Sequence, residues 1–211
     1  MPAYEPRDSA YREARRLGYR SRAALKLIEL DRKFSLFRPS QSVVDLGCWP
    51  GGWLQVAAER TGGRGRVVGI DLKEVDGLGL DNVVTLVGDM NDADLRSLLC
   101  RAVGGPADVV LSDMAPKLSG IRVADQARGQ ALVELAVDVA DGLLAAGGNL
   151  LVKVFSNSQV QATELLRKRY SKVLTFRPAS SRKGSAEIYM LGRGLKEEAG
   201  GLRNGRACVP S

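Results

Sequence analysis

Residues 42–61 read Ser-Val-Val-Asp45-Leu-Gly47-Cys-Trp-Pro-Gly51-Gly-Trp53-Leu-Gln-Val-Ala-Ala-Glu-Arg-Thr61, and this stretch decides the fold. The apolar run at its start predicts a buried strand over residues 42–46, and residues 53–60 predict a helix. The glycines between them allow the backbone to turn sharply and to approach a ligand closely. A buried strand that turns through glycines into a helix is typical of an α/β domain with a ligand at the turn.

Strands and helices alternate on both sides of this stretch. Helices are predicted over residues 21–34, 93–103, 126–144 and 158–169, and strands over residues 66–71, 83–87, 109–112, 150–155, 173–176 and 187–191. The alternation predicts an α/β fold with a seven-stranded, mostly parallel sheet and helices on both faces. Only a loop, residues 177–186, joins the last two strands, so we expect the last strand to run antiparallel. Ser21 should cap the first helix, and Gly147 and Gly148 should end the long one.

The 211-residue chain has the length of a single α/β domain. We expect that domain to occupy residues 21–193, between a basic N-terminal arm (residues 1–20) and a flexible, glycine-rich tail (residues 194–211). No apolar run approaches the ~20 residues of a membrane span, and the first residues lack the apolar core of a signal peptide. We therefore expect a cytoplasmic protein with no membrane partner.

The net charge of +7 is distributed unevenly along the chain. Residues 1–38 hold ten Lys and Arg against five acids, and residues 165–186 hold seven Lys and Arg and no acid. Two basic segments that meet in space would form a phosphate-binding surface. The same charges could instead lie on solvated helix faces that keep the protein in solution. Charge alone does not decide between these interpretations.

The spacing of the glycines limits the class of ligand that can bind at this turn. They fall at positions 47, 51 and 52, whereas dinucleotide binding requires Gly-x-Gly-x-x-Gly. A phosphate-binding P-loop requires Lys followed by Ser or Thr after its last glycine, and Trp53 stands there instead. Neither pyrophosphate cradle fits. A cofactor with a nucleoside and an amino-acid tail fits better.

Aspartates end three successive predicted strands, at Asp45, Asp71 and Asp89. Because the carboxyl ends of parallel strands meet at one edge of a sheet, these side chains should lie near the same ligand. A carboxylate at Asp71 can accept both hydroxyls of a ribose, and Asp89 could accept an adenine amine.

Lys153 lies in an otherwise apolar strand, where a lysine requires a carboxylate partner. Asp113 ends the adjacent predicted strand and is the natural candidate. The chain has no histidine, which removes the commonest general base. It also has no Cys-x-x-Cys pair, and we expect no metal site.

The sequence resembles the FtsJ/RrmJ family of ribosomal RNA 2′-O-methyltransferases, also called RlmE. The matching stretches are residues 19–27, 45–53, 69–72, 88–89, 112–116, 151–155 and 177–187. The resemblance implies a Rossmann-like methyltransferase fold with S-adenosyl-L-methionine (SAM) as cofactor. It implies catalytic roles for Lys26, Asp113, Lys153 and Glu187. It also implies cofactor contacts at Gly51, Trp53, Asp71, Asp89 and Asp113.

This resemblance predicts that a monomer methylates the ribose 2′-oxygen of a uridine in 23S ribosomal RNA, within the assembled large (50S) subunit. Lys153 would act as the base, or would stabilise the developing oxyanion if it stays charged. Transfer RNA is an alternative substrate, and a non-catalytic RNA-binding assembly factor is an alternative function. The chain departs from the family at Cys48 and Trp49, where small residues are usual, and at Leu25, where an aromatic residue is usual.

Overall fold

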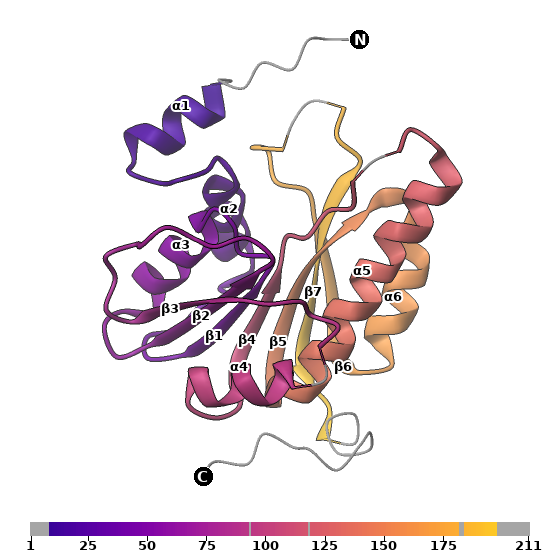
Figure 1. The fold of residues 1–211 in the computed structure, drawn as a ribbon. Helices are drawn as coiled ribbons and strands as arrows, with labels where there is room; N and C mark the ends of the chain where they lie inside the picture. The colour runs from indigo at the N-terminus through magenta and orange to yellow at the C-terminus, as the bar shows by residue number, and fades with distance from the viewer. Residues whose placement is uncertain (1–8, 93, 118, 182–183, 198–211) are drawn as a thin grey trace.

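A computed structural model describes residues 9–92, 94–117, 119–181 and 184–197, which form one sheet covered by helices (Figure 1). The sheet has seven strands in the order β3-β2-β1-β4-β5-β7-β6. The strands are β1 (Ser42–Leu46), β2 (Arg66–Asp71), β3 (Val83–Val87), β4 (Ala107–Ser112), β5 (Leu144–Phe155), β6 (Tyr170–Phe176) and β7 (Glu187–Leu195). The helices are α1 (Ser9–Arg16), α2 (Ala23–Phe34), α3 (Gly52–Thr61), α4 (Leu95–Val103), α5 (Arg122–Leu143) and α6 (Gln159–Arg167), with a 3-10 turn at Ser156–Ser158.

The predicted topology is confirmed. Strands β1 to β5 pair in parallel, and β7 runs antiparallel to both β5 and β6. In Figure 1 the helices α2 and α3 cover one face of the sheet, and α4, α5 and α6 cover the other. None of the helices within the described ranges is long and apolar enough to cross a membrane.

The strand β1 explains how the core is divided between the two faces. Its side chains alternate, so Val43 packs into the hydrophobic cluster beneath α2 and α3, whereas Val44 and Leu46 pack into the cluster beneath α4, α5 and α6. All three are fully buried. A strand with both faces buried reads as a continuous apolar run, as the sequence of β1 does.

Two local predictions are wrong. The helix α5 ends at Leu143 and β5 begins at once at Leu144, so Gly147 and Gly148 lie inside the strand rather than ending the helix. The register between β4 and β5 shifts at this point, and Gly147 has a φ of 79°, a bulge conformation that glycine adopts easily. The residue before α2 is Arg22, without a side-chain cap, and Ser21 therefore is not its N-cap.

The ends of the chain are described in part. Residues 9–16 of the predicted arm form the helix α1, and β7 continues through Leu195, beyond the predicted start of the tail. Residues 1–8 and 198–211 lie outside the described residues. The carboxyl ends of β1, β4 and β5 and the amino end of β7 all lie at the upper edge of the sheet in Figure 1. The predicted site residues gather at this edge.

Candidate active site

The turn between β1 and α3 is held mainly by backbone hydrogen bonds. The N–H groups of Gly47 and Cys48 both donate to the carbonyl of Ile70, at 2.8 and 3.1 Å. Gly47 and Gly51 have φ angles of 78° and 103°, a region that side chains disfavour. A Cβ atom on Gly47 would stand 2.6 Å from Cγ of Met114. Glycine is therefore required both for the turn and for the close approach of β4.

Asp71 and Asp89 have carboxylates that are fixed by neighbouring amides. Asp71 accepts the N–H of Trp49 and the N–H of Lys73, each at 3.0 Å. Asp89 accepts the backbone N–H and the side-chain amide of Asn91, which lower its pKa. Both carboxylates are thus oriented by hydrogen bonds at strand ends, where they can act as acceptors for a nucleoside.

Asp45 is the buried member of the three strand-end aspartates. Its exposed fraction is 1%, and its Oδ2 atom has no hydrogen-bond partner within the described part of the chain. Burial, followed by the charges of Asp113 and Asp71, raises its pKa well above the usual range. The charges of three carboxylates therefore act on one another at this edge of the sheet, where a cationic ligand would be stabilised.

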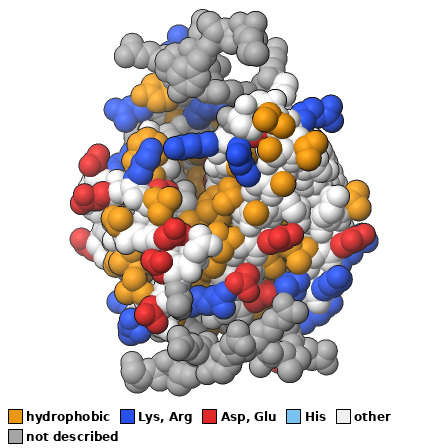
Figure 2. Space-filling view, turned by 45° about the vertical axis from the view of Figure 1, so that its right-hand side comes forward, with side chains coloured by type: hydrophobic (Ala, Val, Ile, Leu, Met, Phe, Trp, Pro, Cys, Tyr) orange, Lys and Arg blue, Asp and Glu red, His pale blue; other side chains and the backbone are white. Residues whose placement is uncertain are grey.

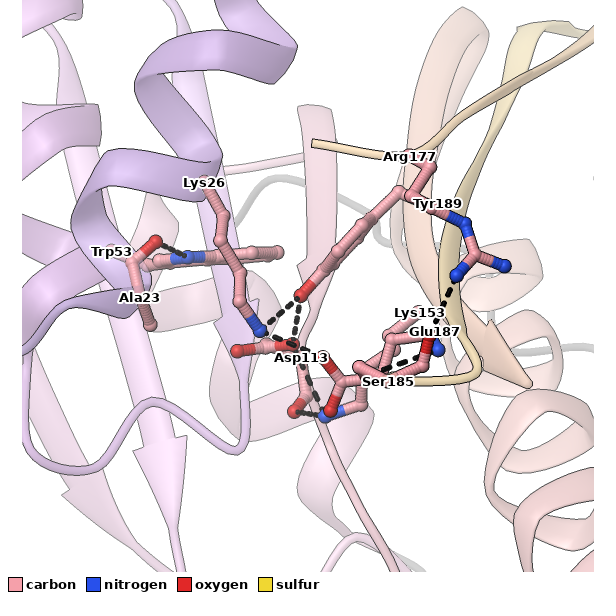
Figure 3. Close-up of polar contacts among 9 residues, drawn as sticks. All are labelled: Ala23, Lys26, Trp53, Asp113, Lys153, Arg177, Ser185, Glu187 and Tyr189. Carbon is pink, nitrogen blue, oxygen red and sulfur yellow. Dashed lines mark hydrogen bonds and ion pairs between the residues drawn. The ribbon is translucent and has the colours of Figure 1, made fainter. Parts of the chain in front are cut away.

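Trp53 lies behind the glycine turn. It is 3% exposed, and its indole N–H donates to the carbonyl of Ala23 at 2.8 Å. Its ring packs against Tyr189 at a centroid distance of 5.9 Å. Trp53 thus connects α3 to α2 and β7, so it links the glycine turn to the elements that carry Lys26 and Glu187 (Figure 3).

The four residues of the predicted tetrad form two ion pairs. Lys26 Nζ lies 2.9 Å from Glu187 Oε2, and Lys153 Nζ lies 3.1 Å from Asp113 Oδ1. The predicted contact between Lys153 and Asp113 is confirmed. Both lysines are buried, with exposed fractions of 5% and 7%. Burial alone would raise the pKa of Glu187, but the nearby lysines outweigh it and the pKa is lowered. Glu187 is therefore held as a carboxylate.

Tyr189 joins the two ion pairs, and the sequence interpretation missed it. Its hydroxyl donates to Asp113 Oδ1 at 2.7 Å and lies 3.3 Å from Lys26 Nζ (Figure 3). Burial, followed by the charge of Asp113, raises its pKa well above the usual value, so the hydroxyl stays protonated. A signal was present in the sequence: Tyr189 is two residues after Glu187 in a strand, and alternate residues share a face.

The loop before β7 is hydrogen-bonded to α2, and a further hydrogen bond joins its two ends. The carboxylate of Glu29, one helical turn after Lys26, accepts the N–H groups of Ala179 and Ser180 at 2.7 and 2.9 Å. Arg177 donates across the loop to the carbonyl of Ser185 at 2.6 Å. The predicted basic residues 182–183 lie outside the described residues.

Lys and Arg side chains lie along the upper part of the molecule, and others lie along its lower right side (Figure 2). On α1, Arg12 and Arg15 are exposed, and Arg16 forms an exposed pair with Glu13. The exposed arginines of α1 are therefore accessible to a phosphate backbone.

Comparisons with known proteins agree with this geometry. The model of FtsJ-like methyltransferases matches residues 19–195. A Methanothermobacter thermautotrophicus protein named ribosomal RNA large subunit methyltransferase E is 44% identical over 195 residues, covering 92% of each chain. A protein of the same name from Halorhodospira halophila is 48% identical over 189 residues, covering 89% of this chain and 88% of its own. The crystal structure of a Plasmodium falciparum protein assigned as a ribosomal RNA methyltransferase matches with a TM-score of 0.71 at 30% identity, covering 84% of this chain and 98% of the other.

The sheet order and the glycine turn define a Rossmann-like methyltransferase. The chain belongs to the FtsJ-like methyltransferase family. Its cofactor is SAM, whose sulfonium and ammonium groups are both positively charged. The pocket fits such a molecule, because the buried Oδ2 atom of Asp45 has no partner within the described ranges and two further carboxylates lie nearby.

Proposed function

We propose that this enzyme methylates a ribose 2′-hydroxyl in the RNA of the large ribosomal subunit, and that the target is a uridine of 23S ribosomal RNA. The observation that carries the proposal is the ion pair between Lys153 and Asp113, which places a buried amine at the edge where the cofactor aspartates lie. The substrate is inferred from the relatives, whose printed name specifies the RNA of the large subunit.

The cofactor side supplies oriented acceptors. We assign the ribose hydroxyls of SAM to Asp71 and its adenine amine to Asp89, because both carboxylates are fixed by backbone amides. Gly51, Trp53 and Asp113 complete the proposed cofactor contacts. Bound here, the cofactor supplies a methyl group that its sulfonium makes electrophilic. Asp45 contributes a buried carboxyl group, whose Oδ2 atom has no partner among the described residues, to this edge of the sheet.

The catalytic side acts on the hydroxyl. In our proposal the 2′-hydroxyl oxygen would displace the methyl group from the cofactor sulfur, and Lys153 Nζ, which needs a free lone pair for this role, would take the hydroxyl proton. Asp113 holds the Lys153 amine in place at 3.1 Å. Lys26 and Glu187 form the second pair, and they position the ribose beside Lys153. Tyr189 keeps the two pairs in register through its hydroxyl.

The basic arm, residues 1–20, precedes the catalytic domain, residues 21–193, and the loop before β7 lies within that domain. In our proposal both segments contact the RNA backbone. The loop before β7 has no aromatic residue, and the arm has Tyr4, Tyr11 and Tyr19 among its arginines. We propose that recognition depends mainly on RNA shape and phosphates. We propose that the protein works as a cytoplasmic monomer, because one chain supplies both ion pairs and the cofactor turn. Size-exclusion chromatography with light scattering tests the oligomeric state.

The decisive experiment supplies tritiated SAM and large subunits that lack the modification, followed by digestion to nucleosides. Parallel reactions use naked 23S RNA and transfer RNA. Lys172→Ala serves as a matched control for a catalytic lysine variant, since Lys172 is an exposed lysine on β6. We expect label in 2′-O-methyluridine from large subunits, and equal label with Lys172→Ala.

Other outcomes would overturn parts of the proposal. Label on a base would exclude ribose chemistry, and stronger labelling of transfer RNA would move the substrate. A complete absence of label, with SAM bound, would favour the non-catalytic assembly factor. A weak dependence of RNA affinity on salt would count against the basic surface, because phosphate contacts release counterions.

A further inference from the structure

Arg20 differs from the other arginines of the basic arm. Its guanidinium donates to two successive carbonyls, those of Asp76 at 2.6 Å and Gly77 at 2.5 Å. Arg12 and Arg15 are exposed on α1, whereas Arg20 is half-buried. Arg20 belongs to the basic arm that we propose contacts RNA, but its two donors bind the segment that follows β2.

That segment, residues 72–82, lies against the cofactor turn. It contains no helix or strand, and it follows directly after Asp71. A Cβ atom on Gly51 would stand 3.2 Å from Leu78 Cδ2 and 3.2 Å from Val75 Cγ1. Val75 is 6% exposed. The segment thus packs on the glycine that leads into α3, and its position affects the space available to the cofactor.

The chain around Arg20 is also anchored to the first turns of α3. Its backbone N–H donates to Gln55 Oε1 at 2.8 Å, and Gln55 Nε2 donates back to the carbonyl of Gly18 at 3.1 Å. Ser21 approaches Gly52 so closely that a side chain at position 52 would collide with the serine Oγ. Residues 18–21 of the chain are therefore held against α3, the helix that follows the cofactor turn, by contacts that do not involve the Arg20 side chain.

We propose that Arg20 is a positioning residue for the cofactor site, which holds the 72–82 segment against Gly51. The guanidinium suits this task, because its rigid, charged fork can bridge two carbonyls, whereas a lysine ammonium cannot reproduce that geometry. Gln55 holds the backbone of Arg20 in place and thereby fixes the point from which the guanidinium extends. The inference rests on the proposed function only in that the bound nucleoside is SAM or its product.

The first test measures S-adenosylhomocysteine binding by calorimetry to the full-length wild type and to three variants. We expect Arg20→Ala to weaken binding by about tenfold, as loss of charged hydrogen bonds to the segment would cause. Arg20→Lys should weaken it by about threefold, since charge is kept and the fork is lost. Arg15→Ala, an exposed arginine of the same arm, should leave this affinity within about twofold but weaken RNA binding.

The second readout is hydrogen exchange of the peptide covering residues 72–82. Without ligand, Arg20→Ala should exchange faster there than the wild type, with the β4 and β5 peptides unchanged. If Arg20→Ala does not fold, Arg20→Lys carries both measurements. Unchanged ligand affinity and unchanged exchange in a folded Arg20 variant would overturn the inference. A wild type that binds no S-adenosylhomocysteine would contradict the cofactor assignment instead, so the two failures are distinguishable.

Discussion

At the cofactor side of the sheet edge, the groups that define the site are mostly backbone amides and glycines; at the catalytic side they are side chains. Asp71 is oriented by the N–H groups of Trp49 and Lys73, and the turn at Gly47 hangs on the Ile70 carbonyl. The ion pairs of Lys26 and Lys153 instead bring together residues from four separate elements. The cofactor side therefore comes from one stretch of chain, residues 45–89, whereas the catalytic side combines residues from position 26 to position 187.

Because of this difference, substitutions on the two sides should affect different steps of the reaction. A change in the backbone of the turn should weaken cofactor binding, whereas truncation of a catalytic side chain should slow methyl transfer and leave cofactor binding intact. Contacts between the two sides are few and specific. Met114, which follows Asp113, touches the site of Gly47, and Trp53 touches Tyr189.

Gly47→Ala should have the largest effect among the substitutions that lower both cofactor affinity and methyl transfer. The new Cβ would meet Met114 Cγ at 2.6 Å, in a backbone conformation with φ of 78°. We expect cofactor affinity and methyl transfer both to fall by about a hundredfold or more. Gly62→Ala is the matched control, because its φ is 69° and nothing lies within 4 Å of its Cβ position. Equal losses in both variants would mean that backbone strain, not the contact with β4, is responsible.

Asp45→Asn should separate stability from binding. The raised pKa of Asp45 means that the folded state binds its proton more tightly than the unfolded state does. Asp45 therefore destabilises the fold increasingly as pH rises above its unfolded pKa, and asparagine removes this effect. We expect the ligand-free variant to melt about 2–4 °C higher at pH 7, with about tenfold weaker cofactor binding. The stability gain should shrink toward pH 4, and a gain that grew on acidification would contradict the account.

Tyr189→Phe tests the bridge between the ion pairs. Phenylalanine keeps the packing on Trp53 but removes the hydroxyl that bonds to Asp113. We expect kcat to fall by about fivefold with cofactor affinity unchanged. Tyr170→Phe is the control, since the Tyr170 hydroxyl is buried without a hydrogen-bond partner among the described residues. If both variants slowed the reaction equally, the bridge would have no special role.

Glu29→Ala should have the smallest effect of these substitutions. The direction of the change in kcat/KM distinguishes two roles of the Glu29 carboxylate. Removal of a negative charge from a basic surface would by itself tighten RNA binding. The carboxylate, however, holds the amides of Ala179 and Ser180. We expect kcat/KM for the ribosomal substrate to fall by about threefold, because the loop before Glu187 loses its anchor. Glu164→Ala, an exposed glutamate on α6, controls for charge. An increase in kcat/KM for Glu29→Ala would reject the anchoring role.

Much of the fold could be predicted from the sequence, because apolar periodicity and glycine turns are local signals. The bounds of β1, β2 and β3 agree with the predicted ranges. The start of β5 was missed, because its glycines resemble a helix end until the pairing with β4 is known. The contact of Lys153 with Asp113 followed from burial alone, since a lysine in an apolar strand requires a partner.

Three features of the site required the structure. Tyr189 shares a strand face with Glu187, but its contacts with Asp113 and Lys26 required the register that places it opposite Lys153. Glu29 bonds to residues about 150 positions away, which no local pattern indicates. Arg20 has the same charge as its neighbours on the arm, and only the direction of its guanidinium distinguishes it.

We propose that Lys153 removes the proton from the 2′-hydroxyl, and that the cofactor binds without help from the Lys153 side chain. The most direct measurement compares Lys153→Ala with the wild type in two assays: methyl transfer to large subunits and S-adenosylhomocysteine binding. We predict that methyl transfer falls by at least about a thousandfold, while the binding affinity stays within about twofold. Methyl transfer near the wild-type rate, with binding intact, would contradict the account.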